Sequence, residues 1–399
     1  MSEKSTPSTR FDGFTNAWEQ RKLGELGSVT KGAALSKADI SETGMPLILY
    51  GELYTTYSEV TYNVIRKTEA VVDDKYLSIL GDILIPTSGE TPEEISRATC
   101  VMVPNVILAG DLLIFRPTKE VDGRILSFIL NHKLNNKIAS IAQGKSIVHI
   151  QASELCQLRV TFPTLPEQKK IASLLSSIDS TLNLCQRKLD LLTQAKKALV
   201  QQIFSRKLRF KADDGSDFPE WEEKKLGEIF TERVERSSTG ELISVTINQG
   251  VVKSSDLDRR DNSSSDKSNY KVVRVGDIAY NSMRMWQGAS GASQYSGILS
   301  PAYTVVIPRK GQDVSFWEYQ FKSDLMLYRF TINSQGLTSD TWNLKYPLFS
   351  KISVQVPSLP EQQKIASCLS SADALINQAR ADLEQWREVK KSLLQQLFV

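Results

Sequence analysis

The chain contains Thr164-Leu165-Pro166-Glu167-Gln168, followed by Ile171-Ala172-Ser173, and repeats it 194 residues later as Ser358-Leu359-Pro360-Glu361-Gln362 and Ile365-Ala366-Ser367. The match continues without a gap for about forty positions, and roughly half of these are identical. Long internal repeats mark duplicated structural units, and a period of this length is half of a molecule rather than one solenoid repeat. The sequence therefore predicts two similar halves.

Each repeated segment is predicted to form one long helix. Thr164-x-x-Glu167 and Ser358-x-x-Glu361 fit a capping box, in which a hydroxyl and a carboxylate accept hydrogen bonds from backbone N–H groups at the helix start. Pro166 and Pro360 fall in the first turn, where a missing N–H costs little. No further proline or glycine interrupts either segment before Gly215 or the chain end.

The apolar residues of both segments follow a seven-residue pattern with alternating spacings of four and three, which predicts a coiled-coil seam. A helix of about 40 residues is about 60 Å long and cannot bury such a stripe alone, so we expect the two copies to pack on each other. Lys196 and Lys390 share one seam position. Either they extend to solvent, or they fix the register of the helices. The predicted seam comprises Ile171, Leu175, Ile178, Leu182, Leu189, Leu192, Leu199, Ile203, Ile365, Leu369, Ile376, Leu383, Trp386, Leu393 and Leu397.

The segments outside the repeat resemble each other only weakly. Both begin with Trp-Glu-x-x-Lys-Leu-Gly-Glu, contain a central Gly-Asp-Ile and carry Gln-Gly near the end. Short apolar runs predict strands, and two short helices per segment are predicted, at 123–135 and 314–328. Each segment is therefore expected to be a mixed α+β domain. The predicted order is a domain at 11–163, a helix at 164–206, a domain at 207–357 and a helix at 358–399.

Composition indicates an ordinary globular protein of about two to three domains, with 41% hydrophobic and 24% charged residues in 399. No apolar run approaches the roughly 18 residues of a membrane span, and the start lacks the apolar core of a signal peptide. Four widely spaced cysteines favour a reducing compartment, so a cytoplasmic location is predicted. The whole chain has a net charge of +3, whereas residues 165–210 alone have a net charge of +6. Such a run of charge is usually a solvated helix face.

Catalytic signatures are missing from the sequence. Gly144-Lys145-Ser146 is not a phosphate-binding loop, because Ala139 stands where that motif needs glycine. Two histidines and no Cys-x-x-Cys pair give little support for a metal site or a nucleophilic triad. No Gly-x-Gly-x-x-Gly follows a predicted strand, so no dinucleotide or S-adenosylmethionine cradle is expected. We therefore predict a recognition protein without a catalytic centre.

Two dissimilar domains separated by two matching Leu-Pro-Glu-Gln helices resemble the specificity subunit of type I restriction–modification systems, over about residues 11–399. The resemblance implies two α/β target recognition domains joined by two long helices in an antiparallel coiled coil, with pseudo-twofold symmetry. It also implies that each domain reads one half of a split, asymmetric site in double-stranded DNA, and that the coil sets the unread gap. The implied partners are two methylation subunits and the restriction/translocase subunits. S-adenosylmethionine, ATP and Mg would belong to these partners, and no cofactor to this chain.

Candidate DNA contacts lie where shared frame elements give way to unlike polar loops, because Arg, Lys, Asn, Gln, Ser and Thr read base edges. Arg284 is the favoured single contact. For Trp286 a place in the core is favoured over stacking on a base, and Asn248 and Gln249 either close a turn or contact DNA. A two-headed adaptor that binds proteins instead of DNA is the alternative function, and co-purification of a methyltransferase would distinguish the two. The candidates are Tyr50, Tyr54, Thr87, Ser88, Lys145, Ser146, Asn248, Gln249, Lys253, Arg259, Arg260, Asn281, Ser282, Arg284, Trp286, Thr338 and Ser339.

Overall fold

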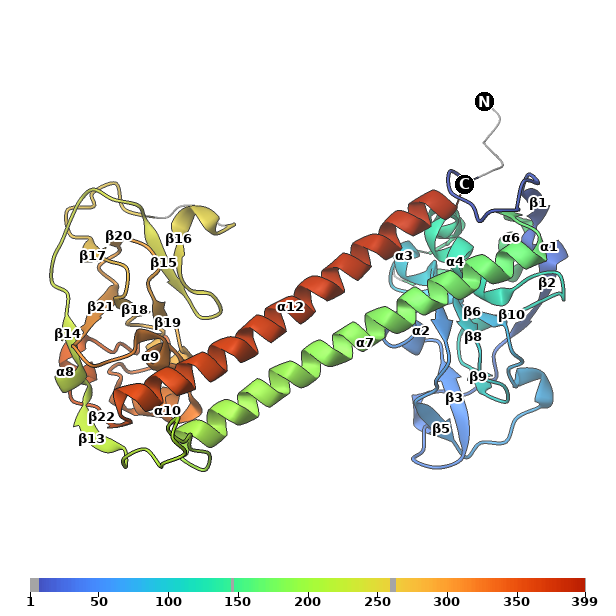
Figure 1. The fold of residues 1–399 in the computed structure, drawn as a ribbon. Coiled ribbons are helices and arrows are strands. Elements are labelled where there is room, and N and C mark those ends of the chain that lie inside the picture. The colour runs from blue at the N-terminus through green and yellow to red at the C-terminus, as the bar shows by residue number, and fades with distance from the viewer. Residues whose placement is uncertain (1–6, 145–146, 259–262, 399) are drawn as a thin grey trace. The chain divides into compact units, whose positions relative to one another are not determined.

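A computed structural model describes residues 7–144, 147–258 and 263–398. The chain divides into two compact units, one formed by Met1–Gln186 with Ala381–Val399 and the other by Arg187–Arg380. Each unit holds one domain of mixed helices and strands and part of each long helix, α7 (Leu165–Phe204) and α12 (Leu359–Leu397) (Figure 1). None of the helices in the described part has the length and apolarity that a membrane crossing requires.

The first unit is built on a five-stranded sheet of order β2-β10-β6-β8-β4. It also contains a three-stranded sheet of order β5-β3-β9 and two strand pairs, β1 with β12 and β7 with β11. The central strand β6 is buried along its whole length, and the apolar face of α4 packs against it. The side chain of Asp122 accepts a hydrogen bond from the N–H of Arg124 (3.0 Å) and thereby caps α4. The strands are β1 Glu19–Lys22, β2 Gly27–Lys31, β3 Met45–Leu49, β4 Val60–Thr61, β5 Arg66–Thr68, β6 Asp82–Pro86, β7 Ser88–Gly89, β8 Thr99–Val101, β9 Ile107–Ala109, β10 Leu112–Pro117, β11 Val148–His149 and β12 Arg159–Phe162. The helices are α1 Leu23–Leu26, α2 Glu52–Thr55, α3 Pro92–Ile95, α4 Gly123–His132, α5 Asn135–Ser140 and α6 Ala152–Gln157.

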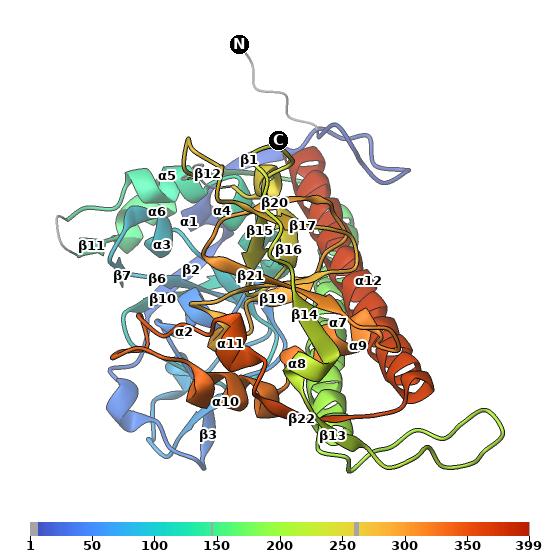
Figure 2. The ribbon, with the colours of Figure 1, turned by 90° about the vertical axis from the view of Figure 1, so that its left-hand side faces the viewer.

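The second unit repeats this frame with different additions. Its four-stranded sheet has the order β14-β21-β18-β19, β13 pairs with β22, and two further pairs, β15-β16 and β17-β20, lie at the end of the unit away from α10 and β22 (Figures 1 and 2). Its core is rich in aromatic rings from α9, α10, α11 and β14. The strands are β13 Glu222–Lys225, β14 Phe230–Glu232, β15 Ile243–Thr246, β16 Gly250–Lys253, β17 Lys271–Val273, β18 Ile278–Asn281, β19 Ser290–Ala292, β20 Gly297–Leu299, β21 Tyr303–Pro308 and β22 Ser353–Val356. The helices are α8 Leu226–Ile229, α9 Val314–Phe321, α10 Asp324–Asn333 and α11 Tyr346–Phe349.

Two short helices are present in each predicted region, but they extend beyond the predicted ranges. α4 and α5 end at Ser140, and α9 and α10 end at Asn333. Ser323 separates α9 from α10: it adopts an extended conformation, and its hydroxyl accepts a hydrogen bond from the N–H of Met326 (3.4 Å).

The glutamates of the repeated motif do not form the predicted capping boxes. Both carboxylate oxygens of Glu167 accept hydrogen bonds from the guanidinium of Arg10 (2.9 and 2.7 Å). Glu361 accepts the corresponding pair from Arg209 (3.2 and 3.0 Å), and the hydroxyl of Ser358 is buried without a partner in the described structure. A bidentate, charge-assisted pair is stronger than a bond to a backbone N–H, so a distant arginine displaces the local cap.

The glutamines of the motif attach each long helix to its domain. The buried amide of Gln168 accepts a hydrogen bond from the N–H of Asp122 (2.8 Å) and donates one to the carbonyl of Pro163 (2.8 Å). Gln362 makes the equivalent bonds to Asp313 (2.9 Å) and Pro357 (2.9 Å). Leu-Pro-Glu-Gln is therefore a structural corner in both halves.

The two long helices pair in opposite directions within each unit. In the first unit, Ile171 and Leu175 near the start of α7 share a core with Leu397 at the end of α12. In the second unit, Ile203 near the end of α7 shares a core with Ile365 near the start of α12. These arrangements, together with the mixed helix and strand content of both domains, give the fold class that the sequence predicted.

The seam residues differ in burial. Trp386 has 37% of its surface exposed, so it is not a seam residue, although its heptad position suggested one. The buried members are Ile171, Leu175, Ile178, Ile203, Ile365, Leu369, Ile376, Leu383 and Leu397. The partly buried members are Leu182, Leu189, Leu192, Leu199 and Leu393.

Candidate nucleic-acid interface

Three loops of the first unit come together as one surface. Strands β7 and β11 pair, which places Ser88 opposite His149. The N–H of Ile150 donates to the carbonyl of Thr87 (3.1 Å), and the hydroxyl of Tyr54 donates to the carbonyl of Ser88 (2.7 Å). The sequence segments around 50–57, 87–90 and 147–149 therefore form one neighbourhood, as candidates for one ligand surface must.

Within this neighbourhood the candidate side chains differ in access to solvent. Tyr50 and His149 are exposed, and the rings of Tyr50 and Tyr54 meet edge to face with centroids 6.3 Å apart. Burial raises the pKa of Tyr54, so its phenol stays protonated at neutral pH. Ser88 is only 8% exposed and donates to a carboxylate oxygen of Asp111 (3.0 Å), so it holds the loop rather than facing a ligand. Lys145 and Ser146 lie outside the described residues.

The second unit presents a tryptophan pair beside Arg284. The N–H of Leu344 donates to the carbonyl of Ser282 (2.8 Å), which holds the segment at 338–344 against the end of β18. The rings of Trp286 and Trp342 meet edge to face at 5.3 Å, and both are partly exposed. The indole N–H of Trp286 donates to the carbonyl of Met283 (3.2 Å). The pair lies at the surface, and neither ring is in the buried core.

Arg284 keeps most of its hydrogen-bonding capacity. Among the described residues, its guanidinium makes one hydrogen bond, to the carbonyl of Met283 at 3.2 Å, and its side chain is partly exposed. A guanidinium has five N–H donors in a planar fork, so four remain for a base edge or a phosphate. Thr338 and Ser339 are exposed in the adjacent loop.

Two candidates at the end of β18 serve the frame instead. Ser282 is 5% exposed, and its hydroxyl lies 2.8 Å from that of Thr304. The side-chain oxygen of Asn281 accepts a hydrogen bond from the N–H of Met283 (3.0 Å). These bonds shape the turn that carries Arg284, so the prediction that Ser282 contacts DNA conflicts with its burial.

The tip of the β15–β16 hairpin carries Asn248 and Gln249, both exposed. The turn itself is closed by Thr246, whose hydroxyl accepts from the N–H of Gln249 (3.0 Å), so the two amide side chains are not needed for closure. They line a hollow of about 570 Å³ together with Lys196, Lys197 and Lys322. The same hollow is lined by Glu318, Asp324 and Asp373, so three carboxylates balance its three lysines and the two amides are left as its neutral hydrogen-bonding groups.

The loop that carries the candidates Lys253, Arg259 and Arg260 is only partly described. The ammonium of Lys253 lies 3.2 Å from a carboxylate oxygen of Glu241 and over the ring of Tyr295 at 5.7 Å. Because both sides of this pair are partly exposed, the contact is weak and a phosphate could replace the carboxylate. Arg259 and Arg260 lie outside the described residues.

Each unit contains a buried ion pair that was not predicted from the sequence. Asp82 of the first Gly-Asp-Ile accepts two bonds from Arg116 (2.9 and 2.8 Å), and Asp277 of the second accepts two from Arg233 (2.7 and 2.8 Å). Each aspartate is nearly inaccessible to solvent. The repeated Gly-Asp-Ile was the signal, and its role is to anchor the central sheets. Among the described residues, no group of His, Cys, Asp and Glu has the arrangement of a metal site.

Comparison with known proteins identifies the family. A family model described as the type I restriction modification DNA specificity domain matches residues 16–194 and 219–385. The chain belongs to this family. Specificity subunits of this family are non-catalytic, in agreement with the prediction from sequence.

Two relatives of this specificity-domain chain come from Methanocaldococcus jannaschii. A candidate specificity subunit of the type I restriction enzyme MjaX is 24% identical over 416 residues, covering 99% of this chain and 96% of its own. The specificity subunit of the MjaVIII enzyme is 24% identical over 307 residues, covering 70% of each chain.

Solved structures show the same fold. The crystal structure of the S subunit of a type I restriction–modification system from M. genitalium superposes with a TM-score of 0.61 at 18% identity, covering 99% of both chains. A chain from a structural study of complex assembly and conformational transition in a type I system gives a TM-score of 0.53 at 14% identity, with 96% and 97% covered.

Proposed function

We propose that this chain reads a bipartite, asymmetric site in double-stranded DNA, one half per domain, for a type I restriction–modification complex. The observation that carries the proposal is the presence of two copies of a DNA specificity domain whose frames match and whose loops do not. Both halves share the attachment of the long helix by the glutamine of Leu-Pro-Glu-Gln and the buried aspartate of Gly-Asp-Ile. Both also pair their first strand with their last. Unlike loops on a shared frame are suited to reading unlike sequences.

The chemistry of the two loop surfaces supports different half-sites. The first unit offers a tyrosine pair and an exposed histidine. The second offers Arg284 beside a tryptophan pair, and a hairpin tip with two amides. Arginine pairs with guanine, and amides pair with adenine, so the second domain has the stronger means of direct readout.

The chain is proposed to work with partner subunits. Its relatives are named as specificity subunits, and one structural match comes from a study of complex assembly. We propose that two methylation subunits and the restriction/translocase subunits dock on it. S-adenosylmethionine, ATP and Mg would then be bound by those partners, while this chain determines which DNA sequence the complex recognises.

The test is to reconstitute the complex and sequence the bases that it methylates. The unaltered complex is expected to methylate one two-part motif with a fixed gap. Arg284→Ala should relax one or two positions in one half of the motif, because a good bidentate contact contributes about 1–3 kcal/mol of discrimination. Tyr50→Ala should affect only the other half.

A matched control distinguishes recognition from folding. Arg274 lies in the same unit and is exposed, and within the described part of the chain its guanidinium pairs only with Glu235 at the surface. Arg274→Ala is expected to leave the motif unchanged. A complex that assembles but methylates without sequence preference would contradict the proposal and favour the protein-binding adaptor.

A further inference from the structure

Two polar layers interrupt the apolar contact between the long helices, one in each unit. In the first unit, the ammonium of Lys390 on α12 lies 2.7 Å from a carboxylate oxygen of Asp179 on α7. In the second unit, the ammonium of Lys196 on α7 lies 2.5 Å from a carboxylate oxygen of Asp373 on α12. Asp179 and Asp373 are equivalent positions of the repeat, and so are Lys196 and Lys390. The two layers are thus the same contact with the helices exchanged.

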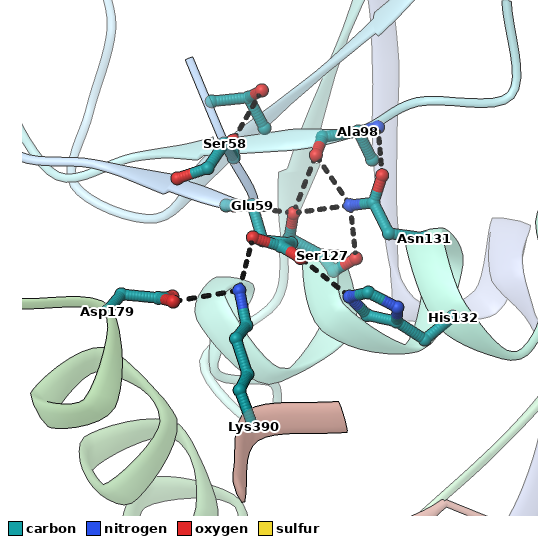
Figure 3. A network of polar contacts seen from close by, with 9 residues as sticks. Ser58, Glu59, Ala98, Ser127, Asn131, His132, Asp179 and Lys390 are labelled. Carbon is teal, nitrogen blue, oxygen red and sulfur yellow. Dashed lines mark hydrogen bonds and ion pairs between the residues drawn. The ribbon is translucent and has the colours of Figure 1, made fainter. Parts of the chain in front are cut away.

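The first layer is also tied to the domain beside it (Figure 3). Lys390 lies 3.0 Å from a second carboxylate, that of Glu59, and only 16% of the lysine side chain is exposed. The other oxygen of Glu59 lies 2.6 Å from a ring nitrogen of His132 on α4. The lysine also lies over the ring of Phe128, 5.5 Å from its centroid.

In the second layer, the domain contributes the phenol of Tyr319, whereas in the first layer it contributes the carboxylate of Glu59. The hydroxyl of Tyr319 on α9 donates to Asp373 (2.8 Å), and the ammonium of Lys196 lies over the tyrosine ring at 5.2 Å. In both units the lysine therefore has an aspartate on the opposite helix and an aromatic ring of the domain. Neither lysine extends freely to solvent, which decides between the two roles that the sequence left open for them.

The charges in the first layer are strongly coupled. Burial acts to raise the pKa of Glu59, but the hydrogen bond with His132 and the charge of Lys390 outweigh it and lower the pKa to about 2. Burial raises the pKa of Asp179, and Lys390 offsets this only in part. Burial also disfavours the ammonium of Lys390, yet the two carboxylates raise its pKa overall. The lysine is thus held charged between two acids.

We propose that these two layers select the antiparallel direction and the register of the helix pair. In a parallel pairing of equivalent positions, Asp179 would face Asp373 and Lys196 would face Lys390, so both layers would repel. The antiparallel pairing converts both into ion pairs. The apolar positions alone make no such distinction, because they repeat every seven residues in either direction.

A slip of one heptad also breaks both layers. Moving α12 by seven residues in one direction places Lys390 opposite Ala172 and Lys196 opposite Ala366. Moving it in the other direction places them opposite Gln186 and Arg380. Every such slip leaves two aspartates and two lysines without partners in a partly buried setting, which is costly.

This role does not require the layers to add stability. Replacing a buried ion pair by apolar residues is often neutral or stabilising, and specifying register is the best attested use of polar residues in a helical seam. The prediction is therefore specific. Removing the layers should leave the protein folded but its helices no longer uniquely aligned.

The test measures helix alignment in the full chain with a pair of nitroxide labels. The labels are placed at Asn183→Cys and Gln385→Cys, two exposed positions of the first unit on opposite helices, after the four native cysteines are replaced. The variant carries apolar residues in both layers: Asp179→Leu with Lys390→Met, and Asp373→Leu with Lys196→Met. Glu59→Gln is added because the loss of Lys390 would otherwise leave that carboxylate without its cation. We expect more than one label distance, with alignments displaced by about 10 Å per heptad.

Two further variants make the result decisive. The charges are exchanged in both layers by Lys196→Asp with Asp373→Lys and by Lys390→Asp with Asp179→Lys, and Glu59→Gln is added because the new carboxylate at 390 would otherwise face Glu59. This variant should retain a single distance because each ion pair is kept. Replacing the exposed pair Glu384 and Arg387 by Leu and Met should also retain it. A single unchanged distance in the apolar variant, or loss of folding in it, would overturn the proposal, as would multiple distances in the charge-exchanged variant.

Discussion

The arginine that caps the second long helix should be among the most sensitive positions of its unit. Arg209 donates two bonds to Glu361, one to Glu220 (2.8 Å) and two to the carbonyls of Phe218 and Pro219 (3.2 and 2.6 Å). The side chain of Glu361 is 1% exposed. Arg209→Ala would leave this carboxylate buried and without a counter-charge.

The expected loss follows from that burial. Removing one partner of a buried ion pair costs roughly 3–5 kcal/mol. Because Arg209 is itself 22% exposed, water can reach the site after truncation, and we expect a loss of about 3 kcal/mol. In a unit of about 190 residues, each kcal/mol lowers the melting temperature by about 2–4 °C, so the expected decrease is about 6–12 °C.

The assay is urea and thermal unfolding of the full chain, followed by circular dichroism. The double variant Arg209→Ala with Glu361→Gln should recover more than half of the loss, because a buried amide costs much less than a buried carboxylate. The control is Arg274→Ala in the same unit, whose exposed pair with Glu235 should contribute about 0.5 kcal/mol or less. Equal destabilisation by Arg209→Ala and Arg274→Ala would refute the reasoning.

Three other predictions follow from the described contacts. Glu59→Gln should destabilise the first unit by about 3 kcal/mol at neutral pH, because the folded pKa of Glu59, about 2, lies below the ordinary 4.5. In urea unfolding, the difference in free energy of unfolding between parent and variant should shrink as pH falls from 4.5 towards 2. A difference that stays constant over this range would contradict the prediction. Ser88→Ala should leave the methylated motif unchanged, because this hydroxyl is buried against Asp111. A heptad inserted into α7 alone should disrupt pairing, whereas matched insertions in α7 and α12 should lengthen the unread gap of the motif without altering either half.

The repeat made the long helices and their pairing predictable. Leu-Pro-Glu-Gln, the heptad pattern and the absence of glycine and proline are local signals, and local signals determine helices well. The roles of Glu167 and Glu361 were not predictable in this way, because their arginines lie about 150 residues away in sequence. The sequence does contain a signal for these arginines, since Arg-Phe precedes Trp-Glu in both halves, at Arg10 and Arg209.

The exposure of the candidate loops was predictable from the sequence, whereas the burial of their individual side chains was not. The segments around Thr87 and Arg284 are at the surfaces where polar loops replace shared frame elements. Within them, Ser88 and Ser282 are buried, while Tyr50 and Thr338 are exposed. Serine in an irregular segment has no periodicity from which its orientation could be read, and the partners Asp111 and Thr304 come from other elements.

The unequal partners of the two polar layers limit how recognition domains can be exchanged. Lys390 pairs with the carboxylate of Glu59, whereas in the other layer the ring of Tyr319 lies against Lys196 and its hydroxyl donates to Asp373. The helices are duplicated, but the domain groups that complete each layer are not. A domain grafted onto the helices must therefore supply an acid or a phenol at this point, because an alanine there would leave the Lys–Asp pair facing an apolar gap. Loops that read DNA can diverge freely, while this contact ties each domain to the frame.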